Sequence, residues 1–551
     1  MQAKPGVLRF EYGENGMMVP RTKTGVPPAG ALPMRATSSA PHRSARPVNP
    51  GFENDGAPGP NPTGWTCSGM DGAAFAEAGG HTGAYRLAHT AAVPFRVETT
   101  QSLTDLTPGW YTLRIHVRRS TGENDAWIGL RDASGRTDKT SVPASPGWLQ
   151  IVVSTFVNEP SCTIVLRTAA DGGEWTHFDD VEFFEGASRL SILGADVSSL
   201  SKAEDLGGVY RTESGTPGDA LATLRDHGLN WIRLRAWVDP ADGYHGTEEL
   251  LSMARRAKQM GIKVLVDLHY SDFWTDPAKQ WTPATWQGRT FPELKQIMVE
   301  YTRGVVLALA SQETPPEMIQ LGNEITTGML WDYAATRTGE STADDGYGTG
   351  TLLTVRHTEN WDNLAELLTA AYDAVKSVSP ATRVMLHIDA GGNNPLYQWW
   401  FGNITERGVP FDLIGASYYP FWHGSLADLQ GNLNDISSRL DMDVVVVETA
   451  YPFTLASSDG WPNVISDPNQ LAEGYAATHA GQAASLRDVM SIVRAIPNGH
   501  GLGVFYWDAT SIAVKGNGWS PRDPDSGNDW ENQALFDFDH RPLPAMGLLV
   551  P

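Results

Sequence analysis

Eight short apolar runs, separated by longer stretches whose apolar positions follow helical spacing, constrain the fold of residues 190–551 most strongly. Runs of this kind indicate buried strands, and the stretches between them indicate amphipathic helices. Because parallel strands need crossovers of this length, the alternation predicts a (β/α)₈ barrel. The runs are Ile192–Val197, Trp231–Arg235, Lys263–Asp267, Met318–Gly322, Arg383–His387, Asp412–Ser417, Val444–Val447 and Val504–Trp507, and the helical stretches include Glu248–Gln259, Phe291–Ala308 and Asn360–Val378.

The chain before the barrel has a different pattern. Residues 47–187 contain short alternating runs, such as Trp110–Val117 and Cys162–Arg167, separated by Gly, Pro, Asp and Ser clusters. This pattern predicts an all-β jelly-roll sandwich. Residues 1–46 carry seven Lys and Arg against two acids and lack the apolar segment of a signal peptide. We expect them to be disordered or not native to the protein.

The composition of the chain disfavours some classes of binding partner. A net charge of −23 disfavours binding to nucleic acid or to anionic membranes. There is no stretch of 18 apolar residues, so no transmembrane helix is predicted. Two cysteines, Cys67 and Cys162, either pair within the first domain or are free thiols. Nineteen Trp suit the binding of sugar rings as well as ordinary core packing.

Two glutamates follow predicted barrel strands. Glu324 ends the segment Met318–Glu324, and Glu448 follows Val444–Val447. The carboxyl ends of barrel strands meet at one face, which carries the chemistry in such folds. Two carboxyls at that face are what glycoside hydrolysis requires, because one protonates the leaving oxygen and the other attacks the sugar or activates water.

Polar and aromatic residues also follow the other strands. Arg233 and Arg235 share strand parity and therefore face the same way, and Glu448 is the obvious carboxylate partner for such an inward pair. Any single residue of this kind could have a purely structural role, but the coincidence at successive strand ends favours a functional site. The further candidates are Asp196, His269, Asp272, Trp274, His387, Asp389, Tyr418, Trp507 and Asp508.

The barrel resembles glycoside hydrolase family 53, the endo-β-1,4-galactanases, over nearly all of residues 190–548. The resemblance rests on an ordered set of motifs: Gly194-Ala195-Asp196, Arg233-Leu234-Arg235-Ala236-Trp237, His269-Tyr270-Ser271-Asp272, Gly322-Asn323-Glu324, Ser417-Tyr418-Tyr419-Pro420, Glu448-Thr449-Ala450-Tyr451-Pro452 and Gly503-Val504-Phe505-Tyr506-Trp507.

The resemblance implies a role for each matching residue. Glu324 would be the acid/base and Glu448 the nucleophile, and Asn323 would bind the substrate 2-hydroxyl. Arg233 would keep Glu448 ionised, and His269, Tyr418 and Trp507 would line the subsite at the cleaved bond. One departure is Asp508, where members of the family usually carry Glu. The segment 338–350, rich in Gly, Asp and Thr, is expected to form a loop that shapes the cleft.

The first domain resembles carbohydrate-binding modules of family 61. The cues are Asn49-Pro50-Gly51-Phe52-Glu53, Gly109-Trp110-Tyr111-Thr112-Leu113, and Trp175 ahead of Phe178-Asp179-Asp180-Val181. Glu53 and Asp180 would ligate a structural calcium ion, or would be ordinary turn acids. The candidate sugar contacts are Trp127, Trp175, Arg131 and Asn124, and core packing is the alternative for either Trp.

We expect an endo-acting, retaining hydrolase of β-1,4-galactan, the side chain of plant pectin, that also binds galacto-oligosaccharides. It would need no cofactor for catalysis, although a structural calcium ion is compatible with the sequence. We expect a secreted monomer. The alternatives are a mannanase or glucanase that uses the same two glutamates, and a galactan-binding protein without activity. A digest panel and a reducing-sugar assay distinguish them.

Overall fold

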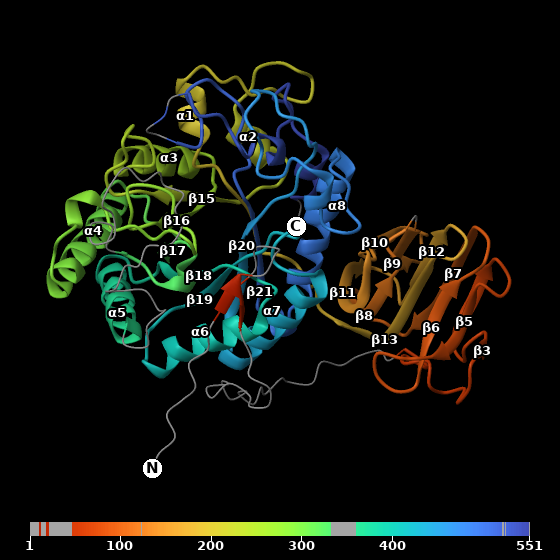
Figure 1. Cartoon of the computed structure of the whole chain (residues 1–551). Coiled ribbons are helices and arrows are strands. Elements are labelled where there is room, and N and C mark those ends of the chain that lie inside the picture. Colours follow the sequence, from red (N-terminus) through yellow and green to blue (C-terminus); the bar gives the residue numbers. More distant parts are fainter. Residues whose placement is uncertain are drawn as a thin grey trace, which may run out of the picture.

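The protein consists of a barrel and a smaller all-β unit beside it (Figure 1). The computed structural model describes residues 10–12, 18–20, 47–122, 124–331, 360–520, 523 and 525–549. Apart from two short paired strands, β1 (Phe10–Tyr12) and β2 (Met18–Pro20), the segment 1–46 lies outside the described residues, and so does the predicted loop 338–350. Within the described residues, no helix is long and apolar enough to cross a membrane.

Eight parallel strands close into a barrel in chain order, as the sequence predicts, and the (β/α)₈ fold is confirmed. The helices lie around the outside of the strands (Figure 1). The strands are β14 (Ile192–Asp196), β15 (Trp231–Ala236), β16 (Lys263–Leu268), β17 (Met318–Leu321), β18 (Arg383–Ile388), β19 (Leu413–Ser417), β20 (Asp443–Thr449) and β21 (Gly501–Tyr506). The helices are α1 (Leu200–Asp205), α2 (Ala220–Asp226), α3 (Thr247–Gln259), α4 (Phe291–Ser311), α5 (Asn360–Val378), α6 (Asn394–Glu406), α7 (Leu426–Leu440) and α8 (His479–Arg494).

Large side chains from neighbouring strands fill the barrel interior. They form one buried cluster that consists of Ile192, Trp231, Leu265, Met318, Met385, Leu413, Val445, Val447 and Phe505. Small residues make room for them. A Cβ atom on Gly194 would lie 2.4 Å from the Phe505 ring, so only glycine fits beside that ring. The interior is a packed core, and the chemistry is therefore confined to the strand ends.

The first domain is a sandwich of two antiparallel sheets, which confirms the predicted all-β class. One sheet has the order β10-β9-β12-β7-β4 and the other has the order β11-β8-β13-β6-β5-β3. Cys67 and Cys162 are both free thiols. The strands are β3 (Gly59–Pro60), β4 (Thr66–Gly69), β5 (Ala74–Ala78), β6 (Tyr85–Thr90), β7 (Phe95–Thr104), β8 (Gly109–Arg119), β9 (Asn124–Asp132), β10 (Thr137–Ser141), β11 (Ser145–Val157), β12 (Ser161–Ala170) and β13 (Trp175–Glu185).

The edge strand β11 lies against helices α7 and α8 of the barrel (Figure 1). The Gln430 side chain on α7 accepts a hydrogen bond from the backbone N–H of Gln150 at 2.6 Å and donates one to the backbone carbonyl of Gln150 at 2.7 Å. The Ser188 hydroxyl donates to the Arg494 carbonyl at 2.9 Å. Gln430 thus pairs with the strand edge as a neighbouring strand would. This contact covers an edge that would otherwise be free to pair with another chain.

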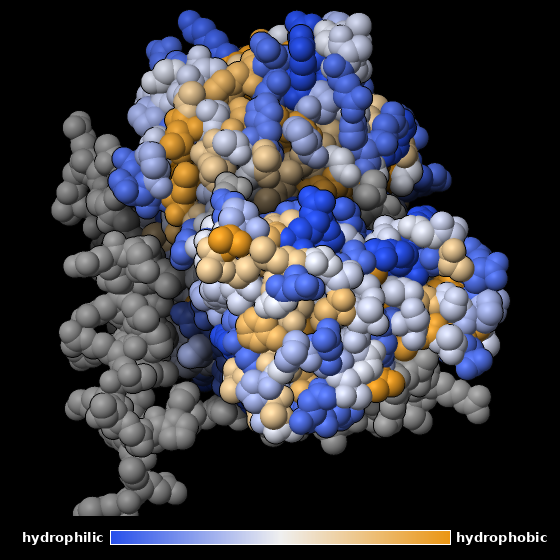
Figure 2. Space-filling model, turned by 90° about the vertical axis from the view of Figure 1, so that its right-hand side faces the viewer, coloured by the Kyte–Doolittle hydropathy of each residue, from blue (hydrophilic) through white to orange (hydrophobic). Residues whose placement is uncertain are grey.

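Away from the barrel, the sandwich surface mixes hydrophilic and apolar side chains (Figure 2). Its exposed large apolar residues include Val48, Met70, Val93 and Phe156. Scattered residues of this kind are normal on a protein surface and need no partner to explain them.

Candidate active site

Glu324 and Glu448, at the ends of β17 and β20, line one cleft of about 420 Å³. Both side chains are largely buried. The polar lining also includes Asn323, Asp389, Asp276, Lys279, His423 and Asp529, and the aromatic lining consists of Trp274, Tyr419, Trp422, Trp507, Trp519 and Trp530. Apolar rings around a few convergent polar groups form a site suited to sugar rings.

The backbone at Glu324 has an uncommon conformation. Its φ of 47° and ψ of 51° lie in the left-handed region, two residues after Gly322 at φ 83°. The Gln280 side chain holds this turn by donating to the carbonyls of Asn323 and Glu324, at 2.7 and 3.3 Å. A strained backbone persists only where the surroundings enforce it, and such positions concentrate at functional sites.

Arg233 binds the second glutamate from below. Its Nη1 atom lies 2.8 Å from Glu448 Oε1, and its Nη2 atom lies 2.8 Å from Asp267 Oδ2. Nη2 also donates to Asn323 Oδ1 at 2.8 Å, while Asp196 lies 3.4 Å from Nη1. The same guanidinium therefore positions Glu448 and Asn323, two of the residues that the sequence predicts to act on substrate.

Burial and nearby charges give the two glutamates different pKa values. Burial raises the pKa of Glu324 well above its ordinary value, and the negative charges of Glu448 and Asp389 raise it further. Burial also raises the pKa of Glu448, to about 7, but the Arg233 charge opposes that rise. Glu324 therefore keeps its proton to higher pH than Glu448, which is the order that an acid and a nucleophile need.

His269 and His387 lie beneath the cleft rather than on its surface. His269 Nε2 contacts Asp267 Oδ2 at 2.8 Å, and its Nδ1 accepts from the Trp237 indole at 3.2 Å. His387 contacts Gln320 and Ser417, at 2.9 and 2.8 Å. Both histidines are buried. They hold the carboxylates and amides above them and do not line the cleft.

Tyr419, and not the predicted Tyr418, faces the cleft. The Tyr419 hydroxyl donates to Glu448 Oε2 at 3.0 Å, whereas the Tyr418 hydroxyl donates to the Gly424 carbonyl at 2.9 Å. The pairing of β19 with β20 shifts register between Ala416 and Ser417, which partners Glu448. The extra residue, Val447, belongs to β20, so the shift affects which β20 residues point inward, whereas Tyr419 has the same strand parity as Ser417. The prediction of Tyr418 rests on the family resemblance and not on parity.

The remaining predicted site residues of the barrel lie in the cleft, in a neighbouring cavity or between two loops. Trp274, Trp507 and Asp389 line the cleft. Asp508 lies in a small neighbouring cavity of about 40 Å³ and accepts from the Ser199 hydroxyl at 2.9 Å. Asp272 accepts from the backbone amides of Asp239 and Ala284, at 3.0 and 2.8 Å, and so braces two loops.

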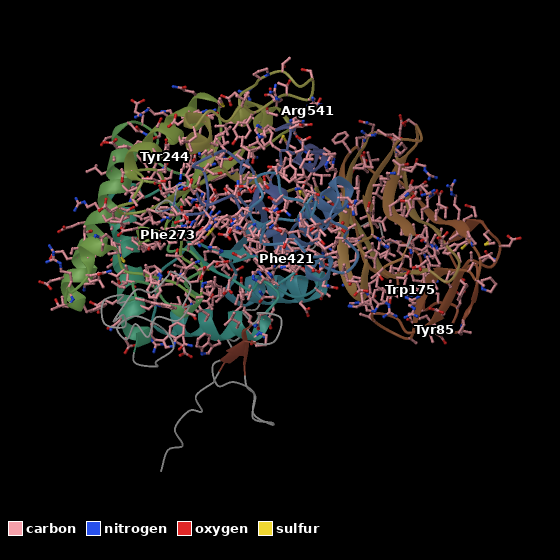
Figure 3. The ribbon with its side chains drawn as sticks, turned by 45° about the horizontal axis from the view of Figure 1, so that its top comes forward. Tyr85, Trp175, Tyr244, Phe273, Phe421 and Arg541 are labelled. Carbon is pink, nitrogen blue, oxygen red and sulfur yellow. The ribbon has the colours of Figure 1, made fainter. Side chains whose placement is uncertain are left out.

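The predicted sugar contacts of the sandwich do not form one group. Trp127 is buried on β9 below Lys139 and Arg167, and Arg131 on the same strand pairs with Glu98 at 3.0 Å. Trp175 belongs to the other sheet (Figure 3). It stacks on His177 at 4.4 Å. Asn124 donates to the Trp175 carbonyl at 3.2 Å and is occupied by that backbone bond.

Each of the predicted calcium ligands, Glu53 and Asp180, has polar partners within the protein. Glu53 Oε1 accepts from the amides of Ala84 and Tyr85, at 2.8 and 2.7 Å. Asp180 contacts His81 Nδ1 at 2.6 Å and, with His116, forms a group whose ligand atoms lie within 4.8 Å of one another. The neighbouring Asp179 is fully buried, and burial raises its pKa to about 7.

Several lining residues were missed by the sequence prediction. Trp519 and Trp530 come from the segment after β21, and Trp422 comes from the segment after β19. Their signal in the sequence was only the high Trp content, because long connections carry no periodicity that fixes where their side chains point.

A (β/α)₈ barrel with two carboxyls of different pKa in an aromatic cleft at its strand ends is the architecture of a barrel glycoside hydrolase. The comparisons with known proteins narrow this class. The chain belongs to glycosyl hydrolase family 53, whose sequence profile matches residues 192–549.

The chain is 32% identical over 400 residues to an endo-beta-1,4-galactanase of Bacillus subtilis, a match that covers 66% of this chain and 87% of that protein. Among solved structures, it is similar to the GH53 catalytic domain of Ignisphaera aggregans, with 35% identity and a TM-score of 0.59, over 66% of this chain and 96% of that domain. A solved CBM61 module in complex with β-1,4-galactotriose covers 26% of this chain at 21% identity and a TM-score of 0.23. A likeness that low does not identify what the first domain binds.

Proposed function

We propose that the protein is an endo-β-1,4-galactanase that cleaves galactan with retention of the anomeric configuration. The observation that carries the proposal is the position of Glu324 and Glu448 in one cleft, with Arg233 in contact with Glu448. Galactan is favoured as the substrate because the named relative is a galactanase. The galactan side chains of pectin are the proposed natural substrate, and the proposed location is extracellular.

The reaction follows from the two roles. A Glu448 oxygen bonds to the anomeric carbon as the glycosidic C–O bond breaks, and Glu324 gives its proton to the leaving oxygen. Water then attacks the anomeric carbon, Glu324 takes a proton from that water, and the bond to Glu448 breaks. Formation of the ester removes the Glu448 charge, so the pKa of Glu324 falls when it must act as a base.

Retention requires the two carboxyl groups to lie about 5–5.5 Å apart, and this spacing is part of the proposal. Early products of galactan digestion should be β-anomers by NMR, and inverted products would contradict the mechanism. Glu448→Gln should bind galactan and lose nearly all turnover. Azide should restore activity to Glu448→Gly and release α-galactosyl azide, because a small anion fills the vacated space.

The substrate is tested by a digest panel on galactan, mannan and glucan, with products resolved by length. Preferred cleavage of mannan or glucan would replace the proposed substrate by one of the alternatives. Absence of reducing sugar from all three would leave a binding protein. A single molecular mass in light scattering tests the proposal that the protein is a monomer.

We propose further that the sandwich binds galactan on the outer face of its six-stranded sheet, around Trp148 and Trp175. Both rings are half-buried, and Arg118 lies between them, 4.8 Å from the Trp148 ring and 5.6 Å from the Trp175 ring. Rings and a cation at one surface can contact a sugar chain by stacking and by hydrogen bonds. Trp175→Ala should weaken pull-down on insoluble galactan, whereas Trp127→Ala, on the opposite sheet, should not.

We also propose a structural calcium ion beside Glu53. Either Asp179 or Asp180 can supply the second carboxylate. A Cβ atom added to Gly51 would lie 3.7 Å from Asp179 Oδ1, 3.8 Å from Glu53 Cγ and 3.9 Å from Asp180 Oδ1. One added to Gly80 would lie 2.3, 2.5 and 2.9 Å from the Tyr85 carbonyl, the Thr82 carbonyl and Asp179 Oδ2. Oxygen ligands of this kind suit calcium. EDTA should lower the melting temperature, and Asp179→Asn should abolish that effect.

A further inference from the structure

Two histidines and an aspartate gather on the outer face of the six-stranded sheet of the sandwich. His116 lies on β8, Asp180 lies on β13, and His81 lies in the connection between β5 and β6. Asp180 Oδ2 is 2.6 Å from His81 Nδ1 and 3.6 Å from His116 Nδ1. One potential ligand atom from each of the three residues lies within 4.8 Å of the other two.

A β-bulge brings Asp180 to this place. Asp179 pairs with His116, and the next pair joins Glu182 to Arg114, so β13 has one more residue than β8 in this stretch. Asp180 lies in the bulge with a φ of 50°, in the left-handed region. Asp179 is fully buried, whereas the Asp180 side chain is 22% exposed and reaches both histidines. Bulges can redirect a side chain in this way.

The loop that carries His81 is held by contacts that do not involve the histidine ring. The backbone N–H of His81 donates to Asp179 Oδ2 at 2.6 Å, and the Thr82 hydroxyl donates to Asp180 Oδ1 at 2.5 Å. Asp180 therefore uses one carboxylate oxygen for the loop and presents the other to the histidines. Removal of the His81 ring should leave the loop in place.

The two histidine rings compete for the same carboxylate oxygen. The rings are stacked, with centroids 3.8 Å apart and an angle of 14° between their planes. Only His81 Nδ1 is within hydrogen-bond distance of Asp180 Oδ2, since 3.6 Å is too long for such a bond. His116 Nδ1 is buried and has no hydrogen-bond partner among the described residues. A buried nitrogen of this kind is costly unless something satisfies it.

We propose that His81, His116 and Asp180 bind a zinc ion, with water as the fourth ligand. Two imidazole nitrogens and one carboxylate oxygen are a ligand set that zinc accepts, whereas calcium and magnesium prefer oxygen ligands. The ion would satisfy His116 Nδ1 and would join the loop between β5 and β6 to β8 and β13. Zinc–nitrogen bonds of about 2.0–2.1 Å require the ligand atoms to move closer together. The His81 side chain, which is 32% exposed, has room to turn.

This site differs from the proposed calcium site. A Cβ atom added to Gly51 would lie 3.9 Å from Asp180 Oδ1, so this oxygen faces the oxygen ligands beside Glu53, and Oδ2 faces the histidines. The His81 ring also meets the edge of Trp148, with centroids 5.7 Å apart. A bound zinc ion would therefore fix a ring at the border of the proposed galactan surface. The inference itself does not depend on galactan binding or on hydrolysis.

The test is isothermal titration calorimetry of zinc chloride into the full chain without a histidine tag, in a buffer with excess calcium chloride. We expect saturable binding of one zinc ion. Loss of a ligand should weaken binding more than loss of an outer partner does, so His81→Ala and His116→Gln should each raise the Kd about 100-fold or more. The melting temperature in the absence of zinc checks that both variants are folded.

His500→Ala is the matched control. His500 also contacts two carboxylates, Asp443 at 3.0 Å and Asp441 at 3.4 Å, but it does so through opposite ring nitrogens. These groups cannot converge on one ion, so zinc affinity should be unchanged. Independent of any variant, Co²⁺ in place of zinc should give the strong visible absorption of a four-coordinate site, saturating at one equivalent.

Three results would overturn the inference: no saturable zinc binding, an unchanged Kd in His81→Ala and His116→Gln, or displacement of zinc by calcium. All three are measured without substrate, so they are distinguishable from failure of the proposed hydrolysis.

Discussion

Arg233 Nη1 lies 2.8 Å from Oε1 of Glu448, and neither side chain is more than 5% exposed. The same guanidinium meets Asp196 and Asp267 at 3.4 and 2.8 Å, so one cation serves three carboxyl groups. Out of water, an unpaired charge is costly, and a fork of N–H groups can satisfy several oxygens at once. Arg233 therefore links the stability of the barrel centre to the ionisation of Glu448.

Arg233→Lys tests that link. A lysine keeps the charge but cannot reach Glu448, Asp267 and Asn323 together, so we expect kcat/KM to fall about 100-fold or more. The acid limb of the pH profile should move to higher pH, because the lysine charge lies farther from Glu448 and opposes its protonation less. Arg383→Lys, at the opposite end of the barrel with Asp443, is the control. An unmoved acid limb in Arg233→Lys would contradict this role.

Asp389→Asn should shift the alkaline limb of the pH profile of kcat/KM. The Asp389 charge raises the pKa of Glu324, so its removal should lower that pKa. Glu324 would then lose its proton at lower pH, and the alkaline limb of kcat/KM should move down. Asp443→Asn should leave that limb in place. The shift is measured from full pH profiles on soluble galacto-oligosaccharides.

Stability should depend on pH through Glu448. The pKa of Glu448 is raised to about 7 in the folded protein, so the folded state holds this proton more tightly than the unfolded state does. The contribution of Glu448 to the free energy of unfolding is therefore complete below its unfolded-state pKa and is lost as pH rises through its folded-state pKa. Glu448→Gln removes that loss. At pH 8 the variant should be more stable than wild type by about 1–3 kcal/mol, and the difference should vanish near pH 4. The free energy of unfolding is measured by denaturant titration of both proteins at both pH values. A stability gain of equal size at pH 4 would refute the prediction.

Trp507 should contact the sugar nearest the cleaved bond. Its ring lines the cleft, and its indole nitrogen is buried without a hydrogen-bond partner among the described residues. Trp507→Phe keeps a ring and removes the N–H, so we expect kcat/KM to fall about ten-fold with a small change in melting temperature. Trp461→Phe, at an exposed loop position, should change neither. Unchanged kinetics with a large fall in melting temperature would make Trp507 a core residue only.

Residues 190–551 should fold without the sandwich, because the barrel closes on itself around its own core. Hydrolysis of short soluble oligosaccharides should persist in this truncation, and binding to insoluble galactan should weaken. The physical reason is effective concentration, since the sandwich holds the cleft near the polymer. Loss of activity on short substrates would instead show that the contact of Gln150 with Gln430 supports the barrel.

The sequence alone determined the barrel and its two glutamates. Buried strands and amphipathic helices leave local periodicities, and eight such alternations admit few folds. Glu324 and Glu448 could be placed because each lies at or near the carboxyl end of a strand, where position along the chain fixes position on the barrel face. That Arg233 and Arg235 face the same way followed from strand parity, and the structure shows Arg233 in contact with Glu448.

Only the tertiary structure decided which neighbours complete the site. The register shift between β19 and β20 places Glu448 opposite Ser417, and Glu448 accepts a hydrogen bond from the hydroxyl of Tyr419, whereas the Tyr418 hydroxyl donates elsewhere. Long connections bring Trp519 and Trp530 into the cleft, and strand order divides Trp127 from Trp175. These outcomes depend on contacts between segments far apart in the chain. Local patterns of hydrophobicity do not encode a bulge, a loop path or the neighbour of an edge strand.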